Sequence, residues 1–166
     1  MKTRRRNNSK KPDDVAKEFV LLGKDPPNFH VETFPEKGRG VVTNSKIRHG
    51  DFVLQYCGNL LSGEEGDYLE ENEPSCFRYF FSHSGQEFCI DATDEPASGP
   101  IFGRLVNHGR GLSGNVKLRV LLVENRPALC MFARRTINPG EELLYDYGVQ
   151  PLPWEKTKKV TSHTMF

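Results

Sequence analysis

The sequence predicts a single, mostly β domain built from short strands. The chain has 166 residues, a length typical of one domain. Its 15 glycines and 11 prolines indicate many turns. Between these turns lie short segments in which apolar and polar residues alternate, and only two segments have a helical pattern. Many short strands with few helices are typical of a mostly β fold.

The first predicted helix begins at Asp13 and stops at Gly23. Asp13 is a candidate N-cap, and Gly23 is a candidate for the left-handed position that ends a helix. Val15, Phe19 and Leu22 recur on one face of this helix and are expected to be buried.

Three strands and a glycine turn are expected next. Residues 29–33 alternate between apolar and polar side chains, and residues 37–40, Lys-Gly-Arg-Gly, predict a tight turn before a strand at 41–43. The segment 52–57 is a stronger strand, with Phe52, Leu54 and Tyr56 on one face and Val53 on the other.

The second predicted helix spans residues 62–72 and begins with a capping box formed by Ser62 and Glu65. It is very acidic, with Glu64, Glu65, Asp67, Glu70, Glu71 and Glu73. Because these carboxylates repel one another, the helix is expected either to be solvated or to lie beside a basic partner.

Two hairpins and a last strand complete the pattern. The hairpins are residues 78–82 with 87–91 around Ser84-Gly85, and residues 119–123 with 128–133 around the turn 125–127. Residues 140–148 contain two tyrosines that bracket an acid, and a strand would place Tyr145 and Tyr147 on one face. Taken alone, this stretch predicts an amphipathic strand.

The net charge of +1 hides an asymmetry along the chain. Residues 1–12 carry six bases and no acid, whereas residues 13–154 carry 14 bases and 21 acids, a balance of −7. The negative charge of residues 13–154 favours basic partners. The alternative is that this charge only keeps the domain soluble. We expect the basic arm 1–12 to be disordered, as a nuclear-import or DNA-contacting segment or as a flexible tail.

Cysteine spacing and hydropathy exclude several classes. The four cysteines form no C-x-x-C pair, so no zinc cluster or other metal site is expected. No apolar run reaches transmembrane length, and no signal-peptide core follows the basic N-terminus. We therefore expect an intracellular protein with reduced thiols and no membrane partner.

Several motifs, taken in order, resemble the signatures of SET-domain protein lysine methyltransferases. They are Lys37-Gly38-Arg39-Gly40, Leu105-Val106-Asn107-His108 and Glu141 to Gly148, with residues 50–53 and 56–58 between them. The resemblance covers residues 36–148. Residues 76–79, 89–93 and 141–148 are most similar to the histone H4 lysine-20 monomethyltransferase subfamily.

The resemblance implies a SET-domain fold of several small sheets, with a C-terminal pseudoknot-like crossing and few short helices. It divides the chain into an N-flanking helix and strand at 13–35, a SET domain at 36–148 and a C-flanking tail at 149–166. S-adenosyl-L-methionine and a basic protein substrate would enter from opposite faces. A narrow lysine channel would join them, and the acidic helix would help to build the peptide groove.

The resemblance also assigns site residues. Tyr147 matches the catalytic tyrosine, Tyr145 the position that limits how many methyl groups are added, and Tyr56 a second channel tyrosine. The matching cofactor contacts are Lys37, Gly38, Arg39, Phe77, Asn107, His108 and Trp154, the last as a residue that stacks on adenine. Without the resemblance, Asn107 and His108 are equally a loop-capping pair, and Tyr56 is equally a core tyrosine.

Four features depart from the family pattern. The acidic insert between Tyr56 and Cys76 is shorter than in the most similar subfamily. Gly109 stands where serine is usual, and Phe77 replaces a tyrosine that contacts the cofactor, which removes a hydrogen bond worth roughly 0.5–1.5 kcal/mol. Residues 91–107 form a longer segment than in the most similar subfamily, with an added Pro-Ala-Ser-Gly-Pro. These changes bear on the substrate and on cofactor affinity more than on the fold.

The expected function is therefore S-adenosylmethionine-dependent monomethylation of a histone lysine, with the H4 tail as substrate. We expect a monomeric enzyme in the nucleus, on the chromosome. Two alternatives stay open: a non-catalytic SET-fold chromatin-binding module, and a methyltransferase of a non-histone protein. Nucleic-acid binding through the basic arm is a weaker hypothesis.

Overall fold

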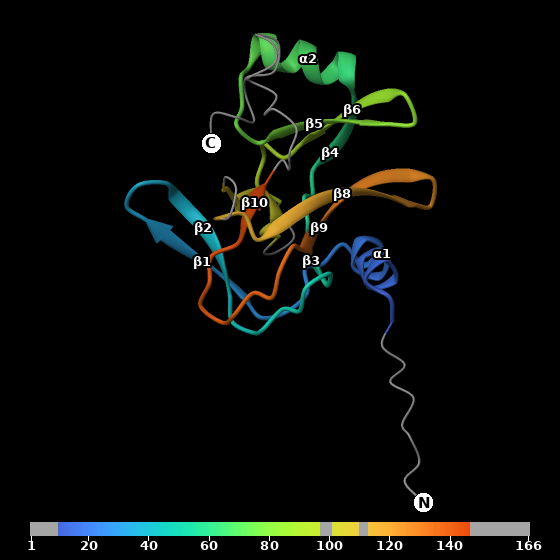
Figure 1. Cartoon of the computed structure of the whole chain (residues 1–166). Helices are drawn as coiled ribbons and strands as arrows, with labels where there is room; N and C mark the ends of the chain where they lie inside the picture. Colours follow the sequence, from blue (N-terminus) through green and yellow to red (C-terminus); the bar gives the residue numbers. More distant parts are fainter. Residues whose placement is uncertain (1–9, 97–100, 110–112, 147–166) are drawn as a thin grey trace, which may run out of the picture.

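The computed structural model describes residues 10–96, 101–109 and 113–146. These residues form three small sheets and two α-helices, which confirms the mostly β prediction (Figure 1). The elements are α1 (Pro12–Leu22), β1 (Phe29–Phe34), β2 (Gly38–Thr43), β3 (Phe52–Gln55), β4 (Asn59–Ser62), α2 (Gly63–Asn72), β5 (Arg78–His83), β6 (Gln86–Asp91), the 3-10 helix η1 (Gly103–Leu105), β7 (Asn107–His108), β8 (Val116–Val123), β9 (Arg126–Ala133) and β10 (Leu144–Asp146).

The central sheet has the strand order β3-β9-β8-β10-β7, and β10 runs parallel to both of its neighbours. Leu144 pairs with Asn107 of β7, while Tyr145 lies opposite His108 on one side and Val116 of β8 on the other. Residues 109–115 connect β7 to β8, so the last strand passes between two strands that this connection joins. This is the pseudoknot-like crossing that the resemblance implies.

The two smaller sheets flank the central one. The β1–β2 hairpin projects at the left of Figure 1, and the sheet β4-β6-β5 carries α2 at the top. The main core joins all three regions; its buried members include Val41, Leu54, Ile90, Met131 and Leu143. Because protein cores are closely packed, this core fixes the relative positions of the loops that connect its strands.

Helix α1 begins one residue earlier than the sequence analysis predicts. Its N-cap is Lys11, without a side-chain cap, because Pro12 at the first helical position already has the helical φ. Asp13 instead accepts a hydrogen bond from Arg119 Nη2 (2.6 Å). The buried face was also partly mispredicted, since Phe19 stacks on Phe52 but Leu22 is 64% exposed.

Three turn and strand boundaries differ from the predictions. The turn expected at 37–40 lies at residues 35–37, and β2 already begins at Gly38, whose φ is +78°. The second hairpin turns at Glu124 and Asn125, which both have positive φ, so Pro127 belongs to β9 rather than to the turn.

Strand β3 does not alternate as expected. The register between β3 and β9 shifts between Phe52 and Gln55, so Phe52 packs under α1 while Val53, Leu54 and Tyr56 all join the main core. A β-bulge of this kind removes the strict two-residue period on which the prediction relied.

The acidic helix α2 has the predicted capping box, with Glu65 N donating to Ser62 Oγ (3.1 Å). It is not simply a solvated acidic helix, because Glu70 is buried and accepts from Arg78 Nη1 at 2.8 Å. Four of its other acids, Glu64, Glu65, Glu71 and Glu73, are exposed.

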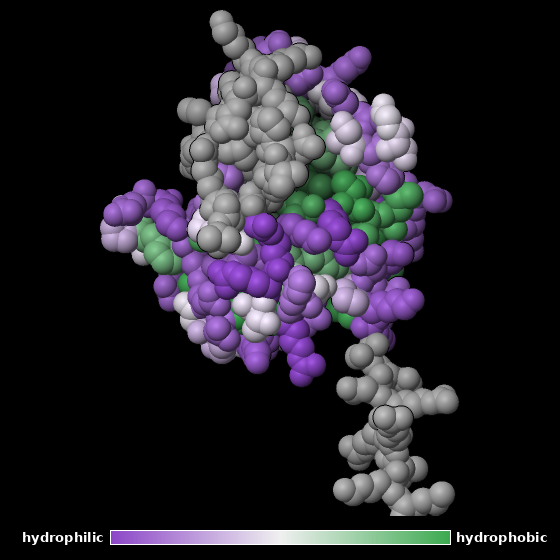
Figure 2. All heavy atoms as spheres, in the orientation of Figure 1, coloured by the Kyte–Doolittle hydropathy of each residue, from purple (hydrophilic) through white to green (hydrophobic). Residues whose placement is uncertain are grey.

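The surface is polar around the β1–β2 hairpin, whereas apolar side chains gather around the β8–β9 hairpin (Figure 2). Leu122, on β8, is 47% exposed there. Neither α-helix in the described ranges is long and apolar enough to cross a bilayer.

Candidate active site

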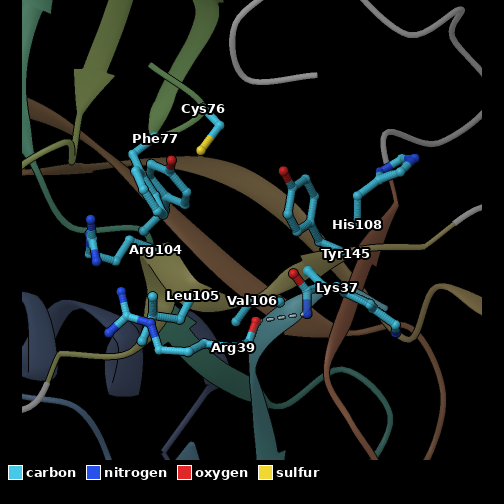
Figure 3. A pocket seen from close by; sticks show the side chains of 11 residues that line it. Lys37, Arg39, Cys76, Phe77, Arg104, Leu105, Val106, His108 and Tyr145 are labelled. Atoms are coloured by element: carbon cyan, nitrogen blue, oxygen red, sulfur yellow. Dashed lines mark hydrogen bonds between the residues drawn. The ribbon is translucent and has the colours of Figure 1, made fainter. Parts of the chain in front are cut away.

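Most of the predicted site residues converge on one pocket of about 120 Å³, between β2, the start of β5, the loop through η1 to β7, and β10 (Figure 3). Figure 3 shows Phe77 beside the Arg104 guanidinium on one side of this pocket, and Tyr145 with His108 on the other. The lining residues are Lys37, Arg39, Tyr56, Cys76, Phe77, Arg104, Leu105, Val106, Asn107, His108 and Tyr145.

Tyrosine rings form the inner wall of the pocket. Tyr56 is 3% exposed and Tyr145 is 7% exposed. Tyr79 of β5 packs against both, with ring centroids 5.8 Å from Tyr56 and 6.3 Å from Tyr145. Burial raises the pKa of Tyr56 well above 10, and the neighbouring Tyr145 adds to the shift, so the Tyr56 hydroxyl keeps its proton near neutral pH.

The opposite wall is held by a carboxylate of the C-terminal segment. Glu142 accepts from Lys37 Nζ through one oxygen (2.6 Å) and from Asn107 Nδ2 through the other (2.8 Å). Asn107 Nδ2 also donates to the Arg39 carbonyl at 3.0 Å. A Cβ on Gly40 would lie 2.5 Å from Glu142 Oε2 and 2.8 Å from Asn107 Nδ2, so any other residue here would displace these two side chains.

Asn115 fixes the strand that carries Tyr145. Its side chain is buried; Nδ2 donates to the Glu142 carbonyl (2.8 Å) and Oδ1 accepts from Leu144 N (2.8 Å). Its own backbone N–H donates to the Leu144 carbonyl at 2.8 Å. One residue of the chain before β8 thus satisfies three backbone groups that would otherwise be buried without partners.

Arg104 is a buried cation whose guanidinium covers one face of Phe77, 3.9 Å from the ring centroid. It donates to the carbonyls of Ala92 (2.7 Å) and Thr93 (3.0 Å), which ties η1 to the end of β6. Glu95 lies 3.3 Å from Arg104 Nη1 and 2.6 Å from Arg39 Nη1. A cation over an aromatic face is favourable. Phe77 can make this interaction with Arg104 because it needs only the ring and no hydroxyl group.

Seven of the ten predicted site residues therefore lie in one pocket, although they come from five separate parts of the chain. Gly38 begins β2 between Lys37 and Arg39 and is not among the lining residues. Tyr147 and Trp154 lie outside the described residues, as do residues 1–9 of the basic arm.

Sequence reasoning missed Arg104, Asn115 and Tyr79 as residues that build the site. Arg104 had a usable signal, because it is a lone charge in the apolar run from Ile101 to Val106. Buried charges are nearly always paired or functional, so this position was recognisable. Asn115 had no such signal, since asparagine beside glycine also predicts an ordinary turn.

No group of three or more His, Cys, Asp or Glu side chains is placed to hold a metal ion within the described ranges. The four cysteines are free thiols, and burial raises the pKa of Cys57, Cys89 and Cys130 to about 12. These three thiols are therefore neutral and unreactive near pH 7.

Comparison with known proteins gives consistent relatives. A SET-domain family model matches residues 38–148. Histone-lysine N-methyltransferase Set8 of Drosophila melanogaster is 42% identical over 136 residues, which cover 79% of this chain and 19% of that protein. Histone-lysine N-methyltransferase set-1 of Caenorhabditis elegans is 39% identical over 152 residues, 86% of this chain and 61% of that protein.

A solved structure agrees with these sequence relatives. The crystal structure of CpSET8 from Cryptosporidium superposes with a TM-score of 0.72 at 35% identity, over 91% of this chain and 72% of that one. The chain spans only about a fifth of the length of the Drosophila relative. The similarity therefore concerns the domain that contains the pocket.

Proposed function

Because the chain belongs to the SET-domain family, we propose that it is an S-adenosyl-L-methionine-dependent protein lysine N-methyltransferase. The observation that carries the proposal is the tyrosine-walled pocket, in which a buried Tyr56 and Tyr145 face a basic and amide-lined rim. One side of such a pocket suits a long aliphatic side chain that ends in an amine. The other side suits a zwitterionic cofactor.

The donor set of the rim fits the cofactor. Lys37, Arg39 and Arg104 line the pocket, each paired with a carboxylate of Glu142 or Glu95, so a ligand carboxylate would have to share their donors. Asn107 and His108 add hydrogen-bonding groups. Phe77 and the aliphatic Leu105 and Val106 offer apolar surface for the rest of the molecule. When bound, S-adenosylmethionine supplies an activated methyl group on a positively charged sulfur.

The chain's own residues would prepare the lysine. A free lysine has a pKa near 10.4, so only about one in a few thousand carries the neutral, nucleophilic amine at pH 7. The rings of Tyr56, Tyr79 and Tyr145 exclude water from the channel, and desolvation lowers the pKa of an amine held there. Protonated tyrosine hydroxyls then orient the amine, and positioning supplies much of the rate. Tyr147 is proposed as the main orienting hydroxyl.

We propose a histone lysine as the substrate, with the H4 tail first, and monomethylation as the outcome. The exposed acids of α2 and the −7 balance of residues 13–154 complement a basic tail. A nuclear, chromosomal location and a monomeric state follow as parts of the same proposal. Residues 1–12 are proposed to contact DNA, and deletion of this arm would reduce the salt dependence of nucleosome binding.

The proposal is tested by incubating the protein with labelled S-adenosylmethionine and nucleosomes or free histones. Mass spectrometry should find methylated lysine, and the Tyr147→Phe variant should lose the transfer while it still binds the cofactor in calorimetry. Tight cofactor binding without transfer to any histone would instead support a methyltransferase of another protein. Absence of both binding and transfer would leave a non-catalytic chromatin-binding module.

The Tyr145→Phe variant is expected to shift the product from monomethyl-lysine towards dimethyl-lysine. The Tyr145 ring packs edge-on against Tyr79 and His108, so phenylalanine keeps this packing and removes only the hydroxyl. Losing one hydrogen bond of roughly 0.5–1.5 kcal/mol, and the water it holds, should change the product ratio about two- to tenfold. Mass spectra of the product with an unchanged ratio would refute this role of Tyr145.

A further inference from the structure

The connection between α1 and β1 places a carboxylate against the loop that builds the pocket. Asp25 is half-buried, and its Oδ2 accepts a hydrogen bond from the backbone N–H of Phe102 at 2.7 Å. The two residues are 77 positions apart, so this contact joins the N-flanking segment to the catalytic domain. No site residue predicted from the sequence lies in that segment.

Phe102 is the residue from which η1 starts. Its carbonyl accepts from Leu105 N (2.9 Å), and the next residue, Gly103, packs directly against the backbone of Gln55 and Tyr56. Arg104 then projects over Phe77. Gly103 has no free space on the Tyr56 side, so it cannot shift in that direction to compensate for a displacement of Phe102. Such a displacement would therefore also move Arg104 and the pocket residues that follow it.

We propose that Asp25 is a positioning residue of the pocket: its carboxylate holds Phe102, and through Phe102 it sets η1 and the Arg104 side chain. The N-flanking segment is then part of the binding machinery and not only a support for the sheet. The effect on the cofactor rests on the proposed function, whereas the effect on Phe102 does not.

The charge state of Asp25 makes the contact sensitive to pH. Burial raises the pKa of Asp25 from 3.8 to about 6, although the Phe102 N–H opposes the shift. The titratable group that faces it from the end of β3 is Cys57, whose pKa is raised to about 12 by burial and by Asp25. That thiol stays neutral between pH 5 and 8, so its charge does not change while Asp25 titrates. The raised pKa means that burying the ionised carboxylate costs more than the Phe102 hydrogen bond returns. The contact is therefore most favourable at low pH, where Asp25 is neutral, and it weakens as the pH rises through about 6.

The variants Asp25→Ala and Asp25→Asn separate the acceptor from its charge, and Asp14→Asn on the exposed first turn of α1 is the matched control. Hydrogen exchange measured by NMR at the Phe102 amide is the first readout. We expect protection at pH 7.5 to fall at least tenfold in Asp25→Ala and to stay unchanged in Asp14→Asn. Equal protection in Asp25→Ala and in the control would overturn the proposal.

The second readout is calorimetric binding of S-adenosylmethionine at pH 7.5 and pH 5. At pH 7.5 Asp25→Ala should bind about three- to tenfold more weakly than the wild type. Asp25→Asn keeps an acceptor oxygen without the buried charge, so it should bind at least as tightly as the wild type. At pH 5 the wild type and Asp25→Asn should bind equally. Affinities of all variants within twofold of the wild type at both pH values would refute positioning. If the wild type binds no cofactor, the proposed function fails. Hydrogen exchange at the Phe102 amide would still show whether Asp25 holds Phe102.

Discussion

Replacing Gly103 by alanine is expected to destabilise the folded protein by about 3 kcal/mol or more and to abolish cofactor binding. A Cβ at this position would lie 2.8 Å from the carbonyl carbon of Gln55, closer still to its oxygen, and 3.2 Å from the Tyr56 Cα. All three are backbone atoms of the last residue of β3 and of the residue that follows it, so no side-chain rotation can relieve the overlap. Relief requires that η1 move away from Tyr56, which opens the pocket.

Urea unfolding and calorimetric cofactor binding measure these two effects. Gly85→Ala in the β5–β6 turn is the control, because Gly85 has a φ of +75° but no atom within 4 Å of the added Cβ. The control should cost only about 1 kcal/mol, from the left-handed backbone alone. If Gly103→Ala costs no more than Gly85→Ala, the close packing of η1 against β3 does not exist in solution.

The Arg78→Met variant is expected to lose about 3–5 kcal/mol of unfolding free energy. Arg78 is 3% exposed at its side chain, donates to Glu70 Oε1 (2.8 Å) and to the Glu73 carbonyl, and its Nε lies 3.3 Å from Asp91 Oδ2. Methionine fills a similar volume, so the cost comes from leaving two carboxylates without their cation. Because this network joins α2 to the β5–β6 hairpin, the pocket residues at the start of β5 should also lose order.

Chemical denaturation of the matched variant Arg135→Met provides the comparison. Arg135 pairs with Glu141 at 3.1 Å, but the two side chains are 45% and 33% exposed. Exposed pairs contribute about 0–1 kcal/mol, so this substitution should be close to neutral. Similar losses in the two variants would show that burial of the Arg78 network contributes nothing.

Local signals in the sequence predicted much of the secondary structure. The Ser62–Glu65 capping box forms as expected, Gly23 ends α1 in the left-handed conformation, and Ser84-Gly85 turns the β5–β6 hairpin with positive φ at both residues. Each of these features depends on a few neighbouring residues, so it is encoded within one short segment. The boundaries that were wrong, such as the start of β2 at Gly38, depend on a partner strand.

The pocket itself was predictable only through the ordered resemblance. Composition and spacing placed Tyr145 in a strand, but they did not bring Lys37, Phe77 and Asn107 to the same cavity. Glu70 shows a second limit: the sequence left open whether the acids of this helix are solvated or lie beside a basic partner, and the fold buries Glu70 beside Arg78. A side chain's environment is set by elements that are distant in the chain, and periodicity within one helix does not report them.

The sequence by itself determined the fold class, most of the elements and, through the motif order, the family. Tertiary structure alone decided which groups hold the site together: Glu142 between Lys37 and Asn107, Asn115 on the strand of Tyr145, and Asp25 on Phe102. The reason is physical. Local conformation follows from neighbouring residues, but burial and hydrogen-bond partners are fixed only when β10 passes between β7 and β8 and the core closes around it.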